Sequence, residues 1–391
     1  MQSDLVSVVV PAFNAEATLA RTLASVQSQT YANLEIVVVD DGSTDGTRRL
    51  AEAEARADPR IRVLSQPNGG VAEARNAGVR ASKGNLVALI DADDLWHPEK
   101  IARQVAVLAE GGPAMGFVYT YYRRIDAHDN VLSMPTVASD YEGYVFLRHL
   151  LFNFVGNGSS LLMRRQAFEA AGGYEPDLQR QGAQGCEDYL LQLLIARSWT
   201  VGVVREYLTG YRSTPGAMSS ERDRMNRSLL LMLEHVRRRV PEVPPDVLAV
   251  AEAALRSRRA MGMLFNKRRP VTAASQYLRA LGCARAPAQA VAGPLFRQSV
   301  SSFVKRRLRR RTPSGGPGYP FPRMNPAIGT APVQDHPLHK WLIAFAEREE
   351  AFFLSGPGGS RTAAPRHDLP SSENGAPPVP GFLPRQLGEG R

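Results

Sequence analysis

Residues 86–96 of the 391-residue chain read LVALIDADDLW, and their pattern gives the clearest indication of the fold. The first five residues, Leu86 to Ile90, form an unbroken apolar run that is typical of a central strand covered on both faces of its sheet. The run stops at Asp91-Ala92-Asp93-Asp94, so we expect these carboxylates at the carboxyl end of the strand. Because ligands of open α/β sheets bind at that edge, the stretch predicts an α/β fold with an acidic ligand site.

The Asp-x-Asp spacing of Asp91 and Asp93 has two interpretations. Two carboxylates on a turning backbone present oxygens to one hard cation, such as Mg2+ or Mn2+, and a cation held there would neutralise a diphosphate. Alternatively, Asp93 or Asp94 caps a helix that begins near Pro98, since proline is favoured in the first turn of a helix. The residues alone leave both interpretations open.

Strand and helix patterns alternate on both sides of this stretch. The apolar runs that predict strands lie at 5–10, 34–39, 61–64, 86–90, 117–122 and 159–163. The segments with helical spacing of apolar residues lie at 18–29, 45–56, 70–81, 99–108 and 187–197. Such alternation predicts a mostly parallel sheet with helices on both faces.

The composition is that of a globular protein, with 43% hydrophobic and 22% charged residues. No apolar run approaches the roughly 18 residues that cross a bilayer, and the start, Met1 to Asp4, lacks the basic region of a signal peptide. We therefore expect a soluble chain in the cytoplasm. The two cysteines, Cys186 and Cys283, lie far apart in sequence, which favours free thiols over a disulfide framework or a zinc site.

The later part of the chain differs in composition. Helical patterns rich in Ala, Leu and Arg predict a small basic helical appendage over residues 222–311. Its last residues, Lys305 to Arg311, form a basic block that suits anionic lipid headgroups at the inner face of the plasma membrane, although a solvated run of charge explains it equally well. Pro and Gly dominate residues 312–391 and predict a mostly disordered tail, apart from one amphipathic helix at 341–353.

Polar turns follow three of the predicted strands, and all three turns belong at the same edge of the sheet. They are Pro11-Ala12-Phe13-Asn14, Asp40-Asp41 and Asp91-Ala92-Asp93. A carboxylate there accepts the N3–H of a uracil or the hydroxyls of a ribose, and Phe13 offers its ring to a base. Asp40 and Asp41 are equally suited to capping the following helix. The glycine loop Gly-x-Gly-x-x-Gly is absent after the first strand, which argues against ordinary dinucleotide binding.

Two further charged sites each have a functional and a structural interpretation. Arg75, on the helix predicted at 70–81, either reaches a phosphate or stays at the solvated surface. Glu187 and Asp188 begin the helix predicted at 187–197, where acids complement the helix dipole. A carboxylate in the same place acts as a general base on an acceptor hydroxyl if it faces the reacting sugar carbon.

Taken together, these motifs resemble glycosyltransferase family 2, whose members have the GT-A fold. The resemblance covers residues 4–215, and the segments that carry it are VVVPAFN at 8–14, VVDDGSTD at 38–45, NGG at 68–70, ARN at 74–76, DADD at 91–94 and ED at 187–188. It implies an inverting hexosyltransferase that uses a nucleotide-sugar, usually UDP-linked, and a divalent metal, Mg2+ or Mn2+. The implied acceptor is a glycan or a lipid-linked glycan in cell-surface polysaccharide or glycolipid biosynthesis, with no role for nucleic acid.

The resemblance also assigns residues to the donor. It implies that Pro11, Phe13 and Asn14 line the nucleoside pocket and that Asp41 reads the base. Arg75 would lie near the base or the phosphates.

Metal binding and catalysis fall to the remaining motifs. The resemblance implies that Asp91 binds the ribose, that Asp93 binds the metal and that Asp188 is the catalytic base. Tyr211-Arg212 resembles the family's late loop over the donor. Some relatives have a metal-binding histidine directly after that pair, whereas Ser213 follows here.

Two other functions use the same features. One is a non-catalytic sugar-nucleotide-binding regulator or assembly scaffold, in which the helical and basic C-terminal part acts; the complete set of acids argues against it. The other is a nucleotidyltransferase, which shares the sheet class but needs a glycine-rich basic loop after the first strand, where this chain has Pro11 to Asn14.

Overall fold

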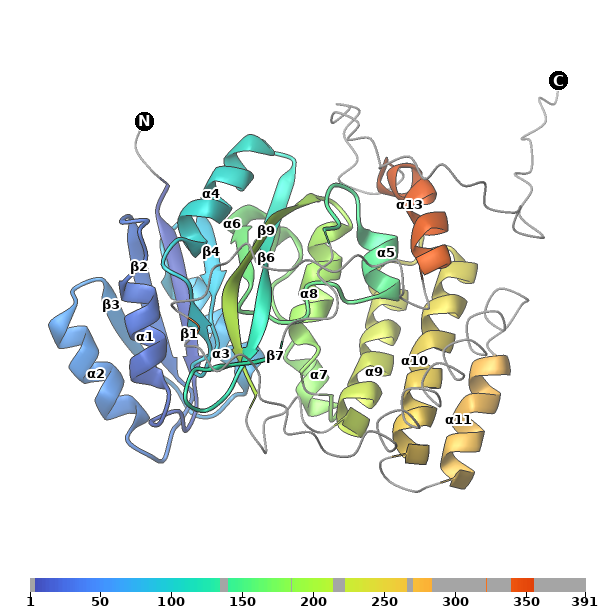
Figure 1. The fold of residues 1–391 in the computed structure, drawn as a ribbon, viewed down its shortest axis with the longest axis horizontal. Coiled ribbons are helices and arrows are strands. Elements are labelled where there is room, and N and C mark those ends of the chain that lie inside the picture. The colour runs from blue at the N-terminus through green and yellow to red at the C-terminus, as the bar shows by residue number, and fades with distance from the viewer. Residues whose placement is uncertain are drawn as a thin grey trace. The chain divides into compact units, whose positions relative to one another are not determined.

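The predicted strands form one mixed sheet in the computed structural model (Figure 1). Within the described residues its strand order is β3-β2-β1-β4-β8-β6-β9-β5, and β7 pairs with β6. The strands are β1 (Val6–Ala12), β2 (Leu34–Asp40), β3 (Ile61–Ser65), β4 (Leu86–Leu89), β5 (Leu95–Trp96), β6 (Met115–Ile125), β7 (Val131–Ser133), β8 (Leu161–Arg164) and β9 (Thr200–Arg212). The structure describes residues 4–133, 140–183, 185–213, 222–265, 270–282, 321 and 339–354.

Four neighbouring strands, β3, β2, β1 and β4, run parallel, as the sequence predicts. Beyond them the sheet is mixed, because β8 runs antiparallel to both β4 and β6, while β6 and β9 are parallel. The expectation of a mostly parallel sheet therefore holds only for the first half. The reversal follows from where β8 begins: Ser159 lies beside the end of β4 and its Oγ accepts a hydrogen bond from the Asp91 N–H at 3.0 Å.

Alternate residues of the central strands pack on opposite faces of the sheet. Val8 and Ile90 join a core formed with α1 (Leu19–Gln27) and α4 (Lys100–Glu110). Val9 joins a second core, formed with α3 (Val71–Ala81) and α8 (Glu187–Ala196). Because both faces are covered, a central strand is apolar at every position, which explains the unbroken run at 86–90.

Of the remaining helices, the one at Thr47–Ala57 adds Ala51 to the first core, and several of the later ones extend the second core. They are α2 (Thr47–Ala57), which packs on β3, the short α5 (Phe146–Leu151), α6 (Arg165–Ala170) and α7 (Asp177–Arg180), and then α9 (Arg222–Arg239), α10 (Pro245–Phe265), α11 (Pro270–Gly282) and α13 (His339–Leu354). Helices α9, α10 and α11 lie side by side (Figure 1). Helix α13, the amphipathic helix expected at 341–353, packs on α5, where Phe352 stacks on Phe146 with ring centroids 5.1 Å apart.

Some sequence predictions fall outside the described residues, among them the basic block Lys305–Arg311 and Cys283. Cys186 is a buried free thiol. The described residues belong to one unit, Met1–Gly359, and Phe321 and α13 are its described parts beyond residue 312. The proposed domain boundaries at 215 and 311 stay predictions. None of the helices that the structure describes is both long enough and apolar enough to cross a membrane.

Candidate functional site

A cavity of about 760 Å³ opens at the carboxyl ends of β1, β2 and β4. Seven of the eight residues that we predict for the site line it, namely Pro11, Phe13, Asn14, Asp41, Arg75, Asp91 and Asp93. The eighth, Asp188, does not line the cavity, but its neighbour Glu187 does. The three polar turns thus meet in one pocket, because the parallel strands that carry them end at the same edge.

The turn after β1 presents an aromatic ring at one end of the cavity. Phe13 is 51% exposed, so one face of its ring is free to pack on a ligand. Asn14 next to it has a positive φ of 49°, a conformation that Asn tolerates better than most residues. Its N–H donates to Ser43 Oγ at 3.0 Å, and its Oδ1 accepts from the Thr44 N–H at 2.8 Å. Asn14 therefore ties the β1 turn to the β2 turn.

Asp41, in the turn after β2, also lines the cavity and accepts several hydrogen bonds. Its Oδ1 accepts hydrogen bonds from Gln66 Nε2 at 2.7 Å and from the Gly69 N–H at 2.9 Å, and its Oδ2 accepts from the Gly70 N–H at 2.8 Å. A carboxylate offers about four acceptor sites, which leaves room for one more donor on Oδ2. The alternative that Asp40 or Asp41 caps the next helix is wrong, since the N-cap of α2 is Gly46.

The acids after β4 have separate roles. Asp91 and Asp93 line the cavity, and burial together with the Asp91 carboxylate raises the pKa of Asp93 to about 6. Asp94 is fully buried and accepts hydrogen bonds from Ser159 Oγ at 2.6 Å and from the Arg212 N–H at 2.8 Å. None of these acids caps a helix, because the N-cap of α4 is Glu99.

The pair Asp91 and Asp93 fits a divalent metal by its chemistry. The described residues contain no cluster of three or more His, Cys, Asp or Glu side chains that is arranged around a metal. Two oxygen-bearing side chains beside an open cavity nevertheless suit Mg2+ or Mn2+, which keep several waters and take further oxygens from bound phosphates. Burial and the charge of Asp91 both raise the pKa of Asp93, and a bound cation would offset the contribution of the Asp91 charge.

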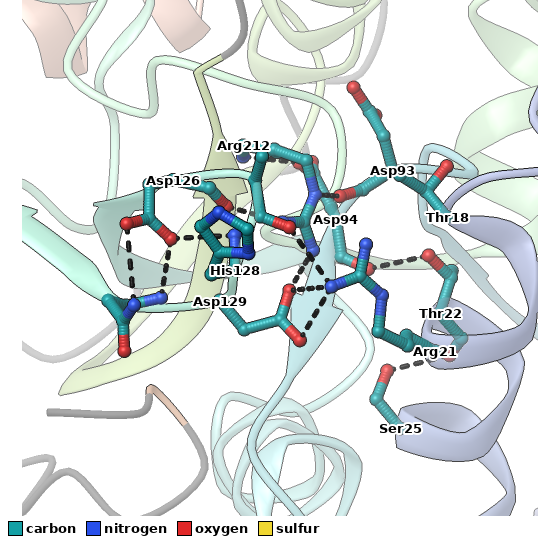
Figure 2. Close-up of polar contacts among 12 residues, drawn as sticks. Thr18, Arg21, Thr22, Ser25, Asp93, Asp94, Asp126, His128, Asp129 and Arg212 are labelled. Atoms are coloured by element: carbon teal, nitrogen blue, oxygen red, sulfur yellow. Dashed lines mark hydrogen bonds and ion pairs between the residues drawn. The ribbon is translucent and has the colours of Figure 1, made fainter.

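Arg212, at the end of β9, donates a hydrogen bond to the backbone of the segment after β4 (Figure 2). Its side chain is buried, and its Nε donates to the Asp93 carbonyl oxygen at 2.5 Å. Its other nitrogens donate to the Asp126 carbonyl oxygen and to the Asp129 carboxylate, both in the turn between β6 and β7. Asp129 also accepts from Arg21 Nη1 at 3.1 Å. One carboxylate therefore bridges two arginines, one from β9 and one from α1.

Arg75 joins the two acidic parts of the site. It is 3% exposed, and its guanidinium donates to Asp91 at 2.6 Å and to Glu187 at 2.9 Å. The ring of Tyr174 packs against it, with the guanidinium carbon 5.1 Å from the ring centroid. The alternative of a solvated surface arginine is therefore wrong. The Arg75 guanidinium is paired with the carboxylates of Asp91 and Glu187.

Glu187 and Asp188 begin α8 but differ in surroundings. Glu187 is buried and accepts from Arg75 and from the Gly185 N–H at 3.0 Å. Asp188 is partly buried, and its Oδ1 accepts from the Tyr189 N–H at 2.7 Å. Burial and the Glu187 carboxylate raise the pKa of Asp188 to about 7, while Arg75 acts in the opposite direction. The pKa of the Asp188 carboxylate thus lies near neutral pH.

Several residues that shape the site have no signal in the sequence. Asp129 and Arg21 belong to no motif, and the pairing of Arg21 with Asp129 spans 108 residues. Tyr174 follows two glycines and reads only as a turn. Gln179, on α7, lies over Gly70, where an added Cβ would meet the Gln179 side chain at 1.6 Å. These contacts arise from tertiary packing, which spacing along the chain does not record.

This fold is similar to that of the GT-A glycosyltransferases. Residues 7–171 match the family model described as glycosyl transferase family 2. An uncharacterised glycosyltransferase of Nostoc sp. is 31% identical over 213 residues, which is 53% of this chain and 64% of that protein. The Escherichia coli protein UDP-Glc:alpha-D-GlcNAc-diphosphoundecaprenol beta-1,3-glucosyltransferase WfgD is 36% identical over 128 residues, 32% of this chain and 49% of that protein. The matches therefore cover less than two thirds of either relative.

Two solved structures share the fold. TarS residues 1–349 of S. aureus, in complex with UDP-GlcNAc, superpose with a TM-score of 0.53 and 17% identity, over 77% of this chain and 81% of that one. The mannosyltransferase PcManGT from Pyrobaculum calidifontis, in complex with GDP-Man and Mn2+, superposes with a TM-score of 0.52 and 23% identity, over 80% of this chain and 89% of that one. At these identities the similarity establishes the fold alone.

Proposed function

We propose that this chain is an inverting, metal-dependent glycosyltransferase that moves a hexosyl group from a UDP-sugar to an acceptor hydroxyl. The observation that carries the proposal is that Phe13, Asp41, Asp91, Asp93 and Glu187 line one cavity, with Asp188 next to Glu187 at the start of α8. The relative in Escherichia coli, whose name specifies a UDP-Glc donor and a diphosphoundecaprenol-linked acceptor, supports this class of donor and acceptor.

The nucleoside would occupy the end of the cavity formed by the turns after β1 and β2. Phe13 packs its exposed ring on the base, and the vacant acceptor position of Asp41 Oδ2 takes a base N–H. Pro11 and Asn14 fix the shape of this end, because Asn14 holds both turns together. Asp91 accepts a hydrogen bond from a ribose hydroxyl.

The diphosphate would lie over Asp93. A divalent cation bound by Asp93 would supply the positive charge that stabilises the departing diphosphate. Arg212 holds the Asp93 backbone, and Arg75 keeps Asp91 in place through their 2.6 Å ion pair. The protein groups therefore position the phosphates before the reaction begins.

Asp188 is the base in this mechanism. The acceptor oxygen attacks the anomeric carbon and transfers its proton to the Asp188 carboxylate, while the bond to the diphosphate oxygen breaks with its electron pair. One displacement inverts the configuration at the anomeric carbon. A pKa of about 7 suits a general base that works near neutral pH.

We also propose that the protein acts in the cytoplasm, at the inner face of the plasma membrane, on a glycan or lipid-linked glycan acceptor in cell-surface polysaccharide or glycolipid biosynthesis. The basic block Lys305–Arg311 supports contact with anionic headgroups. The test of the donor site is calorimetric titration of UDP in the presence of Mn2+ or of a chelator. We expect binding to require the metal and Asp93→Ala to weaken it sharply; equal affinity under all three conditions would refute the metal assignment.

A further inference from the structure

Helix α11 presents an apolar stripe to solvent. Val271 is 83% exposed and Leu278 is 65% exposed, and among the described residues the other exposed large hydrophobic side chain is Phe13 in the pocket. Ala274 is also exposed and lies between them, so the stripe follows the helical spacing i, i+3, i+7. The buried side chains of α11 belong to the face that packs on α10, and they are Ala273, Gln276 and Ala280. We call Val271, Ala274 and Leu278 the α11 stripe.

An open groove of about 1040 Å³ runs along the α11 stripe beside α10. The charged residues that line it are Glu252, Arg256 and Arg279. Glu252 is neutralised by ion pairs with Arg256 at 2.7 Å and with Arg237 at 3.1 Å. Arg279 is exposed beside Leu278. The surface therefore combines exposed aliphatic side chains with a positively charged rim.

The sequence around α11 contains no acid over a long distance. Residues 253–334 include sixteen Lys and Arg residues and neither Asp nor Glu, although the net charge of the whole chain is only +10. Lys267-Arg268-Arg269 directly precede Pro270, the first residue of α11, and the block Lys305–Arg311 follows it. The positive excess of the protein is thus concentrated in the segment that contains the α11 stripe.

We propose that the outward face of α11 is a membrane-contact surface and that it binds an anionic lipid bilayer. At such a surface Val271 and Leu278 enter the boundary between headgroups and acyl chains, while the exposed Arg279 beside Leu278 pairs with a phosphate headgroup. A second copy of this chain fits less well, because two segments with such an excess of positive charge repel each other. The proposal does not depend on sugar transfer, since vesicle binding is measured without nucleotide.

The test is sedimentation of the full chain with vesicles of phosphatidylcholine alone or mixed with phosphatidylglycerol. Val271→Ser/Leu278→Ser removes the apolar side chains without changing charge, so electrostatic attraction is preserved. Ala53→Ser/Ala106→Ser is the matched control at exposed positions of α2 and α4. We expect the wild-type protein and the control to bind the anionic vesicles, and the α11 variant to have a partition coefficient lower by about tenfold or more.

Three results would overturn the proposal. One is that the wild-type protein sediments with neither vesicle, and another is that the α11 variant binds like the wild-type protein. The third is that light scattering shows a wild-type dimer, which the α11 variant dissociates, while vesicle binding is absent. The last result would make the stripe an interface between copies. Thermal unfolding of each variant verifies that reduced binding does not come from loss of the fold.

Discussion

Asp188 and Glu187 are neighbours in sequence, yet only Glu187 is held by a buried arginine, through its 2.9 Å ion pair with Arg75. A carboxylate that is fixed by a cation is a poor proton acceptor, because the cation stabilises its ionised form. Asp188 has a raised pKa, and it takes part in none of the ion pairs of the described residues. This difference between adjacent acids is the structural reason for assigning the base to Asp188.

The substitution Asp188→Asn keeps the shape of the side chain and removes its basicity. We expect transfer to fall by about 10² to 10⁴-fold, the usual contribution of general-base catalysis, while UDP affinity changes little. Single-turnover transfer and calorimetric UDP binding measure the two effects separately. Glu187→Gln is the companion variant: if it abolishes transfer while Asp188→Asn retains a near-normal rate, the base is not Asp188.

The same assignment fixes the pH profile of this prediction. A base with a pKa of about 7 is protonated and inactive below that pH, so the transfer rate should rise as the pH increases through 7. The sign for stability is opposite: because folding raises this pKa from 3.8, the stabilising contribution of protonated Asp188 is lost as the pH rises through about 7. In Asp188→Asn the residual transfer rate should lose this rise.

Asp129 is a positioning residue in this account, since it pairs with Arg212, which in turn binds the Asp93 carbonyl oxygen. Asp129→Ala leaves the buried Arg212 guanidinium without that carboxylate, and we expect a loss of about 1–3 kcal/mol in the free energy of unfolding together with weaker UDP binding. Thermal unfolding and UDP titration measure both quantities. His128→Ala changes an exposed residue of the same turn and should leave both unchanged; similar behaviour of the two variants would remove Asp129 from the site.

At the scale of elements, α13 is fastened to α5 by a buried acid. Glu349 is 2% exposed, and its carboxylate accepts hydrogen bonds from the Leu147 N–H at 2.9 Å and from the Arg148 N–H at 2.7 Å. These N–H groups belong to the first turn of α5, where no intrahelical partner exists. A residue about 200 positions away in sequence thus completes the start of a helix.

The substitution Glu349→Ala tests this contact. It leaves two buried N–H groups without their acceptor, which should cost about 1–3 kcal/mol of unfolding free energy and speed hydrogen exchange in α5 and α13. Glu350→Ala, at the exposed neighbouring position, is the control and should have no effect. Equal denaturation midpoints and equal exchange rates for the two variants would show that the Glu349 carboxylate does not fasten α13 to α5.

The elements of the first half were largely predictable, because each buried strand is an apolar run that ends in a polar turn. The run 86–90 and the acids after it correctly indicate both the central strand and the edge that carries the cavity. The antiparallel direction of β8 was not predictable, because the apolar pattern of residues 159–164 indicates a strand but not the direction in which it runs in the sheet. Nor did spacing indicate that Arg75 is buried, because its partners Asp91 and Glu187 lie 16 and 112 residues away.

At the scale of the whole molecule, two surfaces differ in their chemistry. The cavity at the sheet edge is lined by carboxylates and is large enough for a nucleotide. The α11 stripe, in contrast, presents aliphatic side chains next to the cations Arg256 and Arg279. The first suits a sugar nucleotide with a divalent cation, and the second suits an anionic lipid surface. An acceptor anchored in that surface would remain close to an enzyme that is bound to it.

The central claim is that the cavity turns over a nucleotide-sugar, and incubation of the full chain with a panel of radiolabelled UDP- and GDP-sugars tests it most directly. We expect free sugar to be released from at least one UDP-sugar in the presence of Mn2+ or Mg2+, with water in place of the acceptor. Release should stop when a chelator is added and in Asp93→Ala. Failure of every donor in the panel to be hydrolysed or bound, by protein with an intact cooperative unfolding transition, would contradict the account.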